Sequence, residues 1–324
     1  MSTTDNDLKP EELGQAAAPA IADALTRDFP GAAQVLAEAG LLGVCAHEKA
    51  GGLGLDMAFA LPIVAEAGKM RLHWPLLETI AIAKALGASP LAADVVSGAR
   101  VATWALQGSL VEGFAGHARH AQEADWILLA DGQGGAALLD RRAVRIEEDK
   151  ALDPDYPQAW LTPPAAPTQD QVLARLDTAT YAALRRDAQI LVAGYVNGAA
   201  EGALQATADY LSTRVQFGRP LSAKQAVRHL LARMRLLQEA SRAGIERVLE
   251  VDEYGAARAS APILVNSLAH AAFVLEKAIH LHGGMGFSWE VPLHYALREI
   301  RKFDAAFDAG ALAKSVGQDF IQSV

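Results

Sequence analysis

Long amphipathic segments joined by short connections constrain the fold of this chain most. Apolar residues recur at helical spacing over 172–212, 224–254, 256–282 and 292–322, and the clearest interruptions are FGRPLS and HGGMGF. Amphipathic helices joined this closely pack against one another, because each has an apolar face to bury. We therefore predict an antiparallel helical bundle over residues 166–324.

Two regions of different character precede the bundle. Residues 1–99 are rich in Ala and Leu at helical spacing and are divided by proline and glycine, which predicts several separate helices. Residues 100–165 contain short apolar runs such as VATWAL and DWILLA, separated by Gly and Asp, and end in a Pro-rich connection. Such runs are typical of strands. The predicted order is a helical domain, a small β domain and a helical bundle.

Composition excludes several classes of function. The 324 residues are 51% hydrophobic, and the net charge of -9 disfavours nucleic acid as the main partner, because phosphate binding needs a basic face. Cys45 is the only cysteine, so neither an intrachain disulfide nor a thiolate zinc site is expected. The polar N-terminus is unlike a secretory signal, and no apolar stretch reaches the ~20 residues that span a bilayer. We expect a cytoplasmic protein without a membrane partner.

The stretch RVQFGRPLSAKQ, residues 214–225, can hold an anion. Arg214 and Arg219 flank a turn at Gly218, and two guanidinium groups beside exposed amides suit a pyrophosphate. Phe217 offers a flat apolar face, and Gln225 lies in the first turn of the next helix, where amides point at an anion. A polar corner with surface arginines explains the same residues.

The stretch HLHGGMGF, residues 280–287, is equally ambiguous. Gly283, Gly284 and Gly286 let another group approach the backbone closely, but a helix C-cap followed by a turn has the same pattern. His280 and His282 are two residues apart and so lie on different helix faces, and no nearby cysteine or paired carboxylate completes a metal site. No metal is expected here.

These stretches together resemble the acyl-CoA dehydrogenase family, whose members are flavoproteins. RVQFGRPLSAKQ is similar to the family's Arg-x-x-Phe-Gly motif with a downstream Gln. HLHGGMGFSWEVPLHYALRE is similar to its Gly-Gly-x-Gly segment with a following Arg-acid pair. LAEAGLLGVCAHEKAGGLGLDMAFALPIVAEAGK, near the start, is similar to its N-terminal helix–loop–helix. The resemblance implies a mainly α fold with an N-terminal helical domain, a middle β domain and a C-terminal four-helix bundle.

The resemblance also implies FAD at a subunit interface. On the adenosine-pyrophosphate side of the flavin it places Arg214, Gln216, Phe217 and Gln225. From the other side of the dimer interface it places His280, Leu281, His282, Gly283 and Gly284. The middle domain lacks the family's Thr-Glu-Pro-x-x-Gly-Ser-Asp segment, which lines the flavin ring, so we expect a shortened β domain that does not enclose the ring by itself.

The catalytic base that the family uses is missing from its usual places. Counting from Arg298, the usual glutamate position falls on Phe307, and a one-residue slip would present Asp308, the chain's one tentative catalytic candidate. An acidic helix surface explains Asp308 as well. The family's second location for the base falls on Ala188, beside Asp187.

The activity implied is α,β-desaturation of an acyl-CoA thioester in lipid or steroid metabolism. Some bacterial family members in steroid catabolism pair unlike chains in an α2β2 arrangement, and this chain looks like their short subunit. A homodimer, a structural subunit without catalysis, and a flavin oxidase or hydroxylase on the same fold are the alternatives. For a dehydrogenase, an electron-transfer flavoprotein is a candidate acceptor; in the oxidase or hydroxylase alternative the acceptor is oxygen. Association is expected through residues 269–279 and 312–320, which are apolar beyond what one helix face needs.

Overall fold

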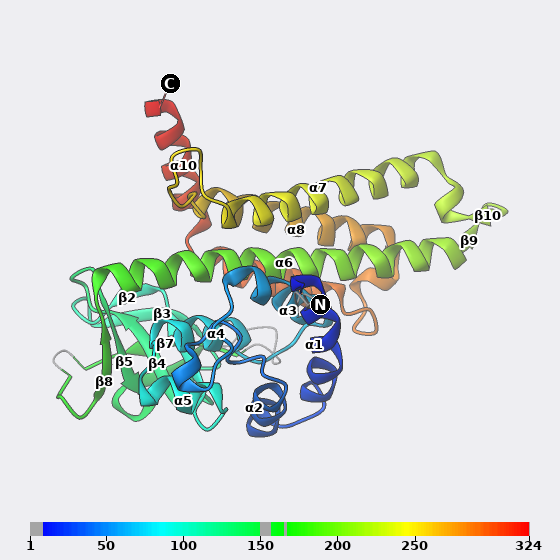
Figure 1. The fold of residues 1–324 in the computed structure, drawn as a ribbon. Helices are drawn as coiled ribbons and strands as arrows, with labels where there is room; N and C mark the ends of the chain where they lie inside the picture. Colours follow the sequence, from blue (N-terminus) through cyan, green and yellow to red (C-terminus); the bar gives the residue numbers. More distant parts are fainter. Residues whose placement is uncertain (1–8, 150–156, 165–166, 324) are drawn as a thin grey trace, which may run out of the picture.

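A computed structural model describes residues 9–149, 157–164 and 167–323. Figure 1 shows the long helix α6 (Thr178–Thr213) running the length of the molecule. The β domain lies at the N-terminal end of α6, and a small hairpin, β9–β10, lies at its C-terminal end. The predicted order of helical region, small β region and C-terminal helices is confirmed.

The N-terminal domain is a set of short helices whose starts are fixed by local caps. Asp28 accepts a hydrogen bond from the Gly31 amide, and Asp56 accepts one from the Ala58 amide. Such side chains satisfy amides that have no partner inside the helix. The elements are α1 (Pro10–Ala24), α2 (Phe29–Glu38), η1 (Glu48–Ala50), α3 (Met57–Met70), α4 (Leu76–Ala85) and α5 (Pro90–Val96).

The β domain consists of two four-stranded sheets, with strand orders β1-β4-β5-β8 and β2-β3-β7-β6 among the described residues. Its own core includes Ile127, Leu129, Leu139 and Leu161, all buried. The elements are β1 (Ala102–Ala105), β2 (Gln107–Ser109), β3 (Phe114–Arg119), β4 (Trp126–Ala130), β5 (Ala136–Asp140), η2 (Arg141–Ala143), β6 (Arg145–Asp149), β7 (Gln158–Thr162) and β8 (Val172–Leu176).

Strand β8 corrects the sequence prediction that helix begins at residue 172. Its apolar spacing fits a helix as well as a strand, but it pairs antiparallel with β5, from Ala136 opposite Leu176 to Leu139 opposite Val172. The β region therefore extends past the predicted boundary at residue 165. Asp177 then caps α6 by accepting a hydrogen bond from the Thr180 amide.

The C-terminal bundle is built from α6 to α9, with α8 packed against α6, α7 and α9. The predicted helix over 292–322 is in fact two helices, because Asp308 adopts a left-handed backbone with φ of 45°. The remaining elements are β9 (Val215–Gln216), β10 (Arg219–Pro220), η3 (Leu221–Ala223), α7 (Gln225–Leu249), α8 (Ala261–Leu281), η4 (Gly283–Phe287), α9 (Leu293–Ala306) and α10 (Ala309–Ser323).

Helix α8 is, by length and composition, apolar enough to cross a membrane, which differs from the expectation that no such stretch exists. More than half of that segment, 56%, is buried inside the bundle, as in the core helix of a folded domain. Within residues 269–279, Ala271, Val274 and Leu275 are among those that pack inside the chain. Helix α10 is largely exposed, with Phe320 and Ile321 at 70% and 75% exposure.

Helices α3 and α6 approach closely through paired glycines. A methyl group at Gly198 would overlap the carbonyl oxygen of Ala65, and one at Gly68 would overlap that of Tyr195. Neither backbone oxygen can move without shifting a helix. This contact ties the N-terminal domain to the bundle.

We expect Gly198→Ala to lower the free energy of unfolding by about 1–3 kcal/mol, because overpacking forces the helices apart. Gly317→Ala is the matched control, since a methyl there meets no atom within 4 Å and alanine favours helix. Urea denaturation of both variants measures the difference. Equal stability of the two would contradict the contact described.

Candidate functional site

The first predicted segment forms a tight hairpin between α6 and α7. Phe217 and Gly218, the two central residues, have φ of 57° and 76°, as a two-residue turn of this handedness requires. The turn holds the Phe217 ring 88% exposed, and the Lys224 ammonium lies 4.9 Å from its centre. The sequence thus builds an aromatic side chain that points into solvent at the end of the bundle.

Two arginines and an uncapped helix N-terminus belong to the same segment as this ring. Arg214 and Arg219 are both exposed, and α7 begins at Gln225 with no capping side chain among the described residues. A helix N-terminus beside two guanidinium groups favours a diphosphate, and an exposed ring favours a flat aromatic group. The residues present therefore fit the adenosine-diphosphate half of FAD.

The second predicted segment lies where α8 ends. The His282 side chain is buried, and its Nδ1 lies 2.8 Å from the Ala278 carbonyl oxygen, to which it donates a hydrogen bond. Gly286 packs against α8, where a methyl would overlap the Ile279 carbonyl. Thus His282 and Gly286 have structural roles, in agreement with the helix C-cap explanation.

The rest of this segment is open. His280, Gly283 and Gly284 are exposed, and no atom lies within 4 Å of a methyl placed on either glycine. Gly283 has φ of 61°, which favours glycine. The backbone here can be approached closely by another group, while Leu281 is half-buried beneath it.

A stack of two aromatic rings connects the second segment to the end of α6, which leads into the first segment. The His282 and Tyr210 rings lie 4.4 Å apart at 15°, and Tyr210 is in the last turn of α6, just before Arg214. The second segment therefore lies against the last turn of α6, from which the first segment continues, so both are at one end of the bundle. Figure 1 shows that this end is opposite to the β domain along α6.

Asp308 lies at the junction of α9 and α10, and its contacts are those of a capping residue. Its carboxylate accepts a hydrogen bond from the Ala311 amide at 3.2 Å, and its own amide donates to the Ala305 carbonyl. The side chain is exposed, whereas Phe307 is half-buried against the core. An exposed carboxylate lacks the desolvation that makes a carboxylate strongly basic.

The second location for a base is also occupied by structural contacts. Ala188 is fully buried, and Asp187 forms a 2.7 Å ion pair with the Lys84 ammonium of α4. Burial raises the pKa of the nearby Cys45 thiol to about 12, so that thiol is not a nucleophile at neutral pH.

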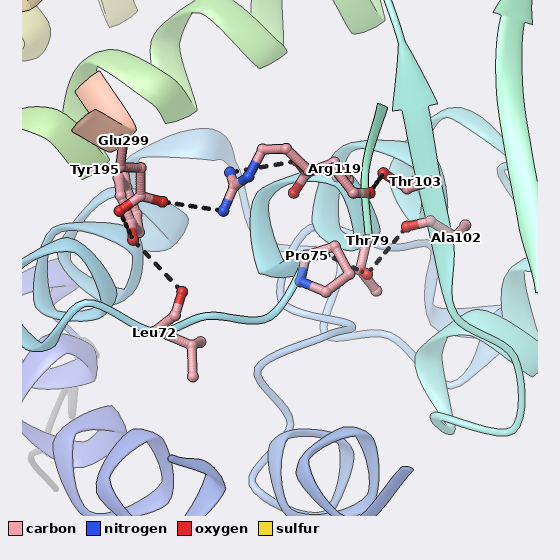
Figure 2. A network of polar contacts seen from close by, with 9 residues as sticks. Leu72, Pro75, Thr79, Ala102, Thr103, Arg119, Tyr195 and Glu299 are labelled. Carbon is pink, nitrogen blue, oxygen red and sulfur yellow. Dashed lines mark hydrogen bonds and ion pairs between the residues drawn. The ribbon is translucent and has the colours of Figure 1, made fainter. Parts of the chain in front are cut away.

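A buried polar network lies where the β domain meets the helices, and sequence analysis did not predict it (Figure 2). Arg119 of β3 lies 3.4 Å from Glu78 of α4 and 3.1 Å from Glu299 of α9. The Tyr195 hydroxyl of α6 donates to Glu299 at 3.0 Å. The Phe303 ring covers the guanidinium at 4.6 Å. This network fills the inner side of α9, next to the turn where the family's base is expected.

Residues 186–306 match the family described as "Acyl-CoA dehydrogenase, C-terminal domain". This part of the chain is similar to an acyl-CoA dehydrogenase C-terminal domain. Over 251 residues the chain is 29% identical to "Acyl-CoA dehydrogenase IpdE2" of Mycobacterium tuberculosis, covering 76% of this chain and 72% of that relative.

Two solved structures share the fold over almost the whole chain. One is described as "Tcur3481-Tcur3483 steroid ACAD G363A variant", with a TM-score of 0.84, 24% identity, and coverage of 97% of this chain and 98% of that chain. The other is the "ChsE4-ChsE5 complex from Mycobacterium tuberculosis", with a TM-score of 0.81, 20% identity, and coverage of 99% and 98%. The acyl-CoA dehydrogenase fold therefore extends through the N-terminal and β domains.

Proposed function

We propose that this chain is a subunit of an FAD-dependent acyl-CoA dehydrogenase that introduces an α,β double bond into a CoA thioester. In this proposal it completes a flavin site together with a homologous partner chain, in a dimer or an α2β2 tetramer. The observation that carries the proposal is the position of the two segments, 214–225 and 280–284, at the same end of the bundle, farthest from the chain's own β domain.

The position of that end explains why a partner is required. Arg214 and Gln216 would bind the diphosphate, Phe217 the adenosine, and Gln225 the anion through the start of α7. The open backbone at Gly283 and Gly284 would lie against the flavin from the second segment. Because the chain's own β domain is at the other end of α6, another chain must cover the ring. The chemistry that bound FAD would supply there is acceptance of the hydride that leaves the substrate β-carbon.

The proton must leave the α-carbon to a base, and three carboxyl groups of the described residues near the expected positions are unsuited to this role. Asp308 caps a helix in solvent, and Asp187 is paired with Lys84. Glu299 is held by Arg119 and by the Tyr195 hydroxyl. A carboxylate that is paired or solvated is a weaker base than a desolvated one. We therefore assign proton abstraction to a glutamate of the partner chain.

A structural subunit without catalysis is the second candidate. The buried network between the β domain and α9 favours it, because side chains rather than a substrate occupy that interface. The two candidates differ in whether segments 214–225 and 280–284 touch flavin.

Co-expression with a longer homologous chain tests the proposal. The complex should purify yellow, with flavin bound, and should desaturate a CoA thioester with an electron-transfer flavoprotein as acceptor. Flavin bound to the partner alone with undiminished activity would favour the structural subunit. Full activity of this chain by itself would overturn the need for a partner.

We expect Asp308→Asn to reduce turnover of that complex less than tenfold. Asparagine also caps helices and also tolerates a left-handed backbone, so the α9–α10 junction is kept while the basic carboxylate is removed. Asp308→Ala is the control for the cap and should destabilise α10 by about 1 kcal/mol. Loss of several orders of magnitude in Asp308→Asn, with full FAD occupancy, would show that Asp308 is the base.

A further inference from the structure

The buried network of Glu78, Arg119, Tyr195 and Glu299 joins all three domains. Glu78 comes from the N-terminal domain, Arg119 from the β domain, and Tyr195 and Glu299 from the bundle. The side chains of the three charged members are between 0% and 5% exposed. The four groups therefore interact without screening by water.

Among the described residues, the two carboxyl groups of this network share one guanidinium. A buried carboxylate that is not closely paired is very costly in a medium of low polarity, and a bound proton removes that cost. Its location follows from the hydrogen bonds of the two carboxyl groups.

Glu299 accepts a hydrogen bond from each of two donors, the Arg119 guanidinium and the Tyr195 hydroxyl. Donors of this kind stabilise an ionised carboxylate. Glu78 has only the longer contact to Arg119, through Oε1, while its Oε2 is buried with no hydrogen-bond partner among the described residues. The free-energy cost of binding the proton is therefore lower at Glu78 than at Glu299.

We propose that these four side chains form a proton-carrying latch between the three domains, in which Glu78 is a neutral carboxylic acid and Glu299 is the carboxylate that pairs with Arg119. The latch holds α9 against β3 and α4. It would open from the Glu78 side when that proton is lost, because two carboxylates would then compete for one guanidinium.

Two histidines are titratable groups of the described residues close to the latch. His120 follows Arg119 in the chain and is hydrogen-bonded to Glu123 at 2.9 Å, and burial lowers the pKa of its imidazole. His73, in the connection before α4, lies close enough to His120 to lower that pKa further. On the remaining side the guanidinium meets the Phe303 ring. Arg119 contacts both latch carboxyl groups, and its contact with Glu299 is the shorter one.

The latch makes a specific prediction about pH. Burial raises the pKa of Glu78 above its usual range, and Arg119 offsets only part of that rise. The folded chain therefore keeps a proton that the unfolded chain has already lost. The stabilising contribution of Glu78 is complete below its unfolded pKa, near 4.3, and is lost as pH rises through the folded pKa.

Three variants of the full-length chain test this inference: Glu78→Gln, Glu299→Gln and Tyr195→Phe. Glutamine keeps the size of the neutral acid, so Glu78→Gln should remove the Glu78 part of the fall in melting temperature with rising pH and should be no less stable than wild type at the alkaline end. Glu299→Gln should lower the melting temperature at every pH above the unfolded pKa, by roughly 5 °C or more, because Arg119 loses its carboxylate. Tyr195→Phe should give a smaller fall.

Infrared spectroscopy supplies a readout that a purely structural role would not change. The wild-type chain should show the carbonyl band of a protonated, buried carboxyl at a pH where exposed glutamates are ionised, and Glu78→Gln should lack it. A wild-type spectrum without that band overturns the inference, even if the variants fail to fold. A band that persists in Glu78→Gln and disappears in Glu299→Gln would place the proton on the other carboxyl and would also overturn it.

Discussion

Replacement of Arg119 by leucine is expected to lower the free energy of unfolding by about 3–5 kcal/mol, the usual cost of breaking a buried ion pair by removing one partner. The reason is the charge left behind: the buried Glu299 carboxylate would lose its 3.1 Å contact with the guanidinium, and Glu78 would lose its 3.4 Å contact. Leucine also vacates the space above the Phe303 ring. Urea denaturation of the purified chain measures the loss.

Arg142→Leu is the matched control for that experiment. Arg142 lies in the same domain and pairs with Asp140 at 2.7 Å, but its side chain is 84% exposed. Surface pairs of this kind contribute about 0–1 kcal/mol. If both arginine replacements cost the same, the network does not join the domains as described.

Replacement of Arg214 by alanine is expected to weaken FAD binding to the complex about tenfold to a hundredfold. It removes a charge-assisted contact to the diphosphate, which is usually worth ~1.5–3 kcal/mol. The backbone of the hairpin should survive, because the Arg214 carbonyl, not its side chain, accepts the hydrogen bond from Leu221. Flavin release followed by fluorescence gives the dissociation constant.

Arg242→Ala is the control here, because Arg242 is an exposed arginine of α7 whose partner is Glu239 rather than the hairpin. It should leave the dissociation constant unchanged. An unchanged constant for Arg214→Ala as well would show that segment 214–225 does not hold the cofactor, and the second candidate function would then be preferred.

The chain order of helical and β regions could be predicted from the sequence because it is set locally. Helical spacing and the breaks at FGRPLS and HGGMGF located the bundle helices to within a few residues in most places. Where local signals are equivocal, the prediction was wrong. The apolar spacing of Val172–Leu176 fits a helix as well as a strand, and this segment is a strand because it pairs with β5. Residues 307–308 carry no glycine or proline, and Asp308 ends α9 by adopting a conformation that aspartate visits only occasionally.

The candidate site could likewise be predicted only in part from the sequence. The sequence by itself determined which residues form the two segments, since their glycines, arginines and aromatic rings are adjacent in the chain. Their position at one end of the bundle, away from the chain's own β domain, depends on tertiary packing, in which the Tyr210 ring of α6 stacks on His282. The buried network could not be predicted from the sequence, because its contacts join residues that are 41, 104 and 180 positions apart. Spacing patterns report neighbours along a helix or strand, whereas a charge becomes buried and paired only when separate elements pack and exclude water.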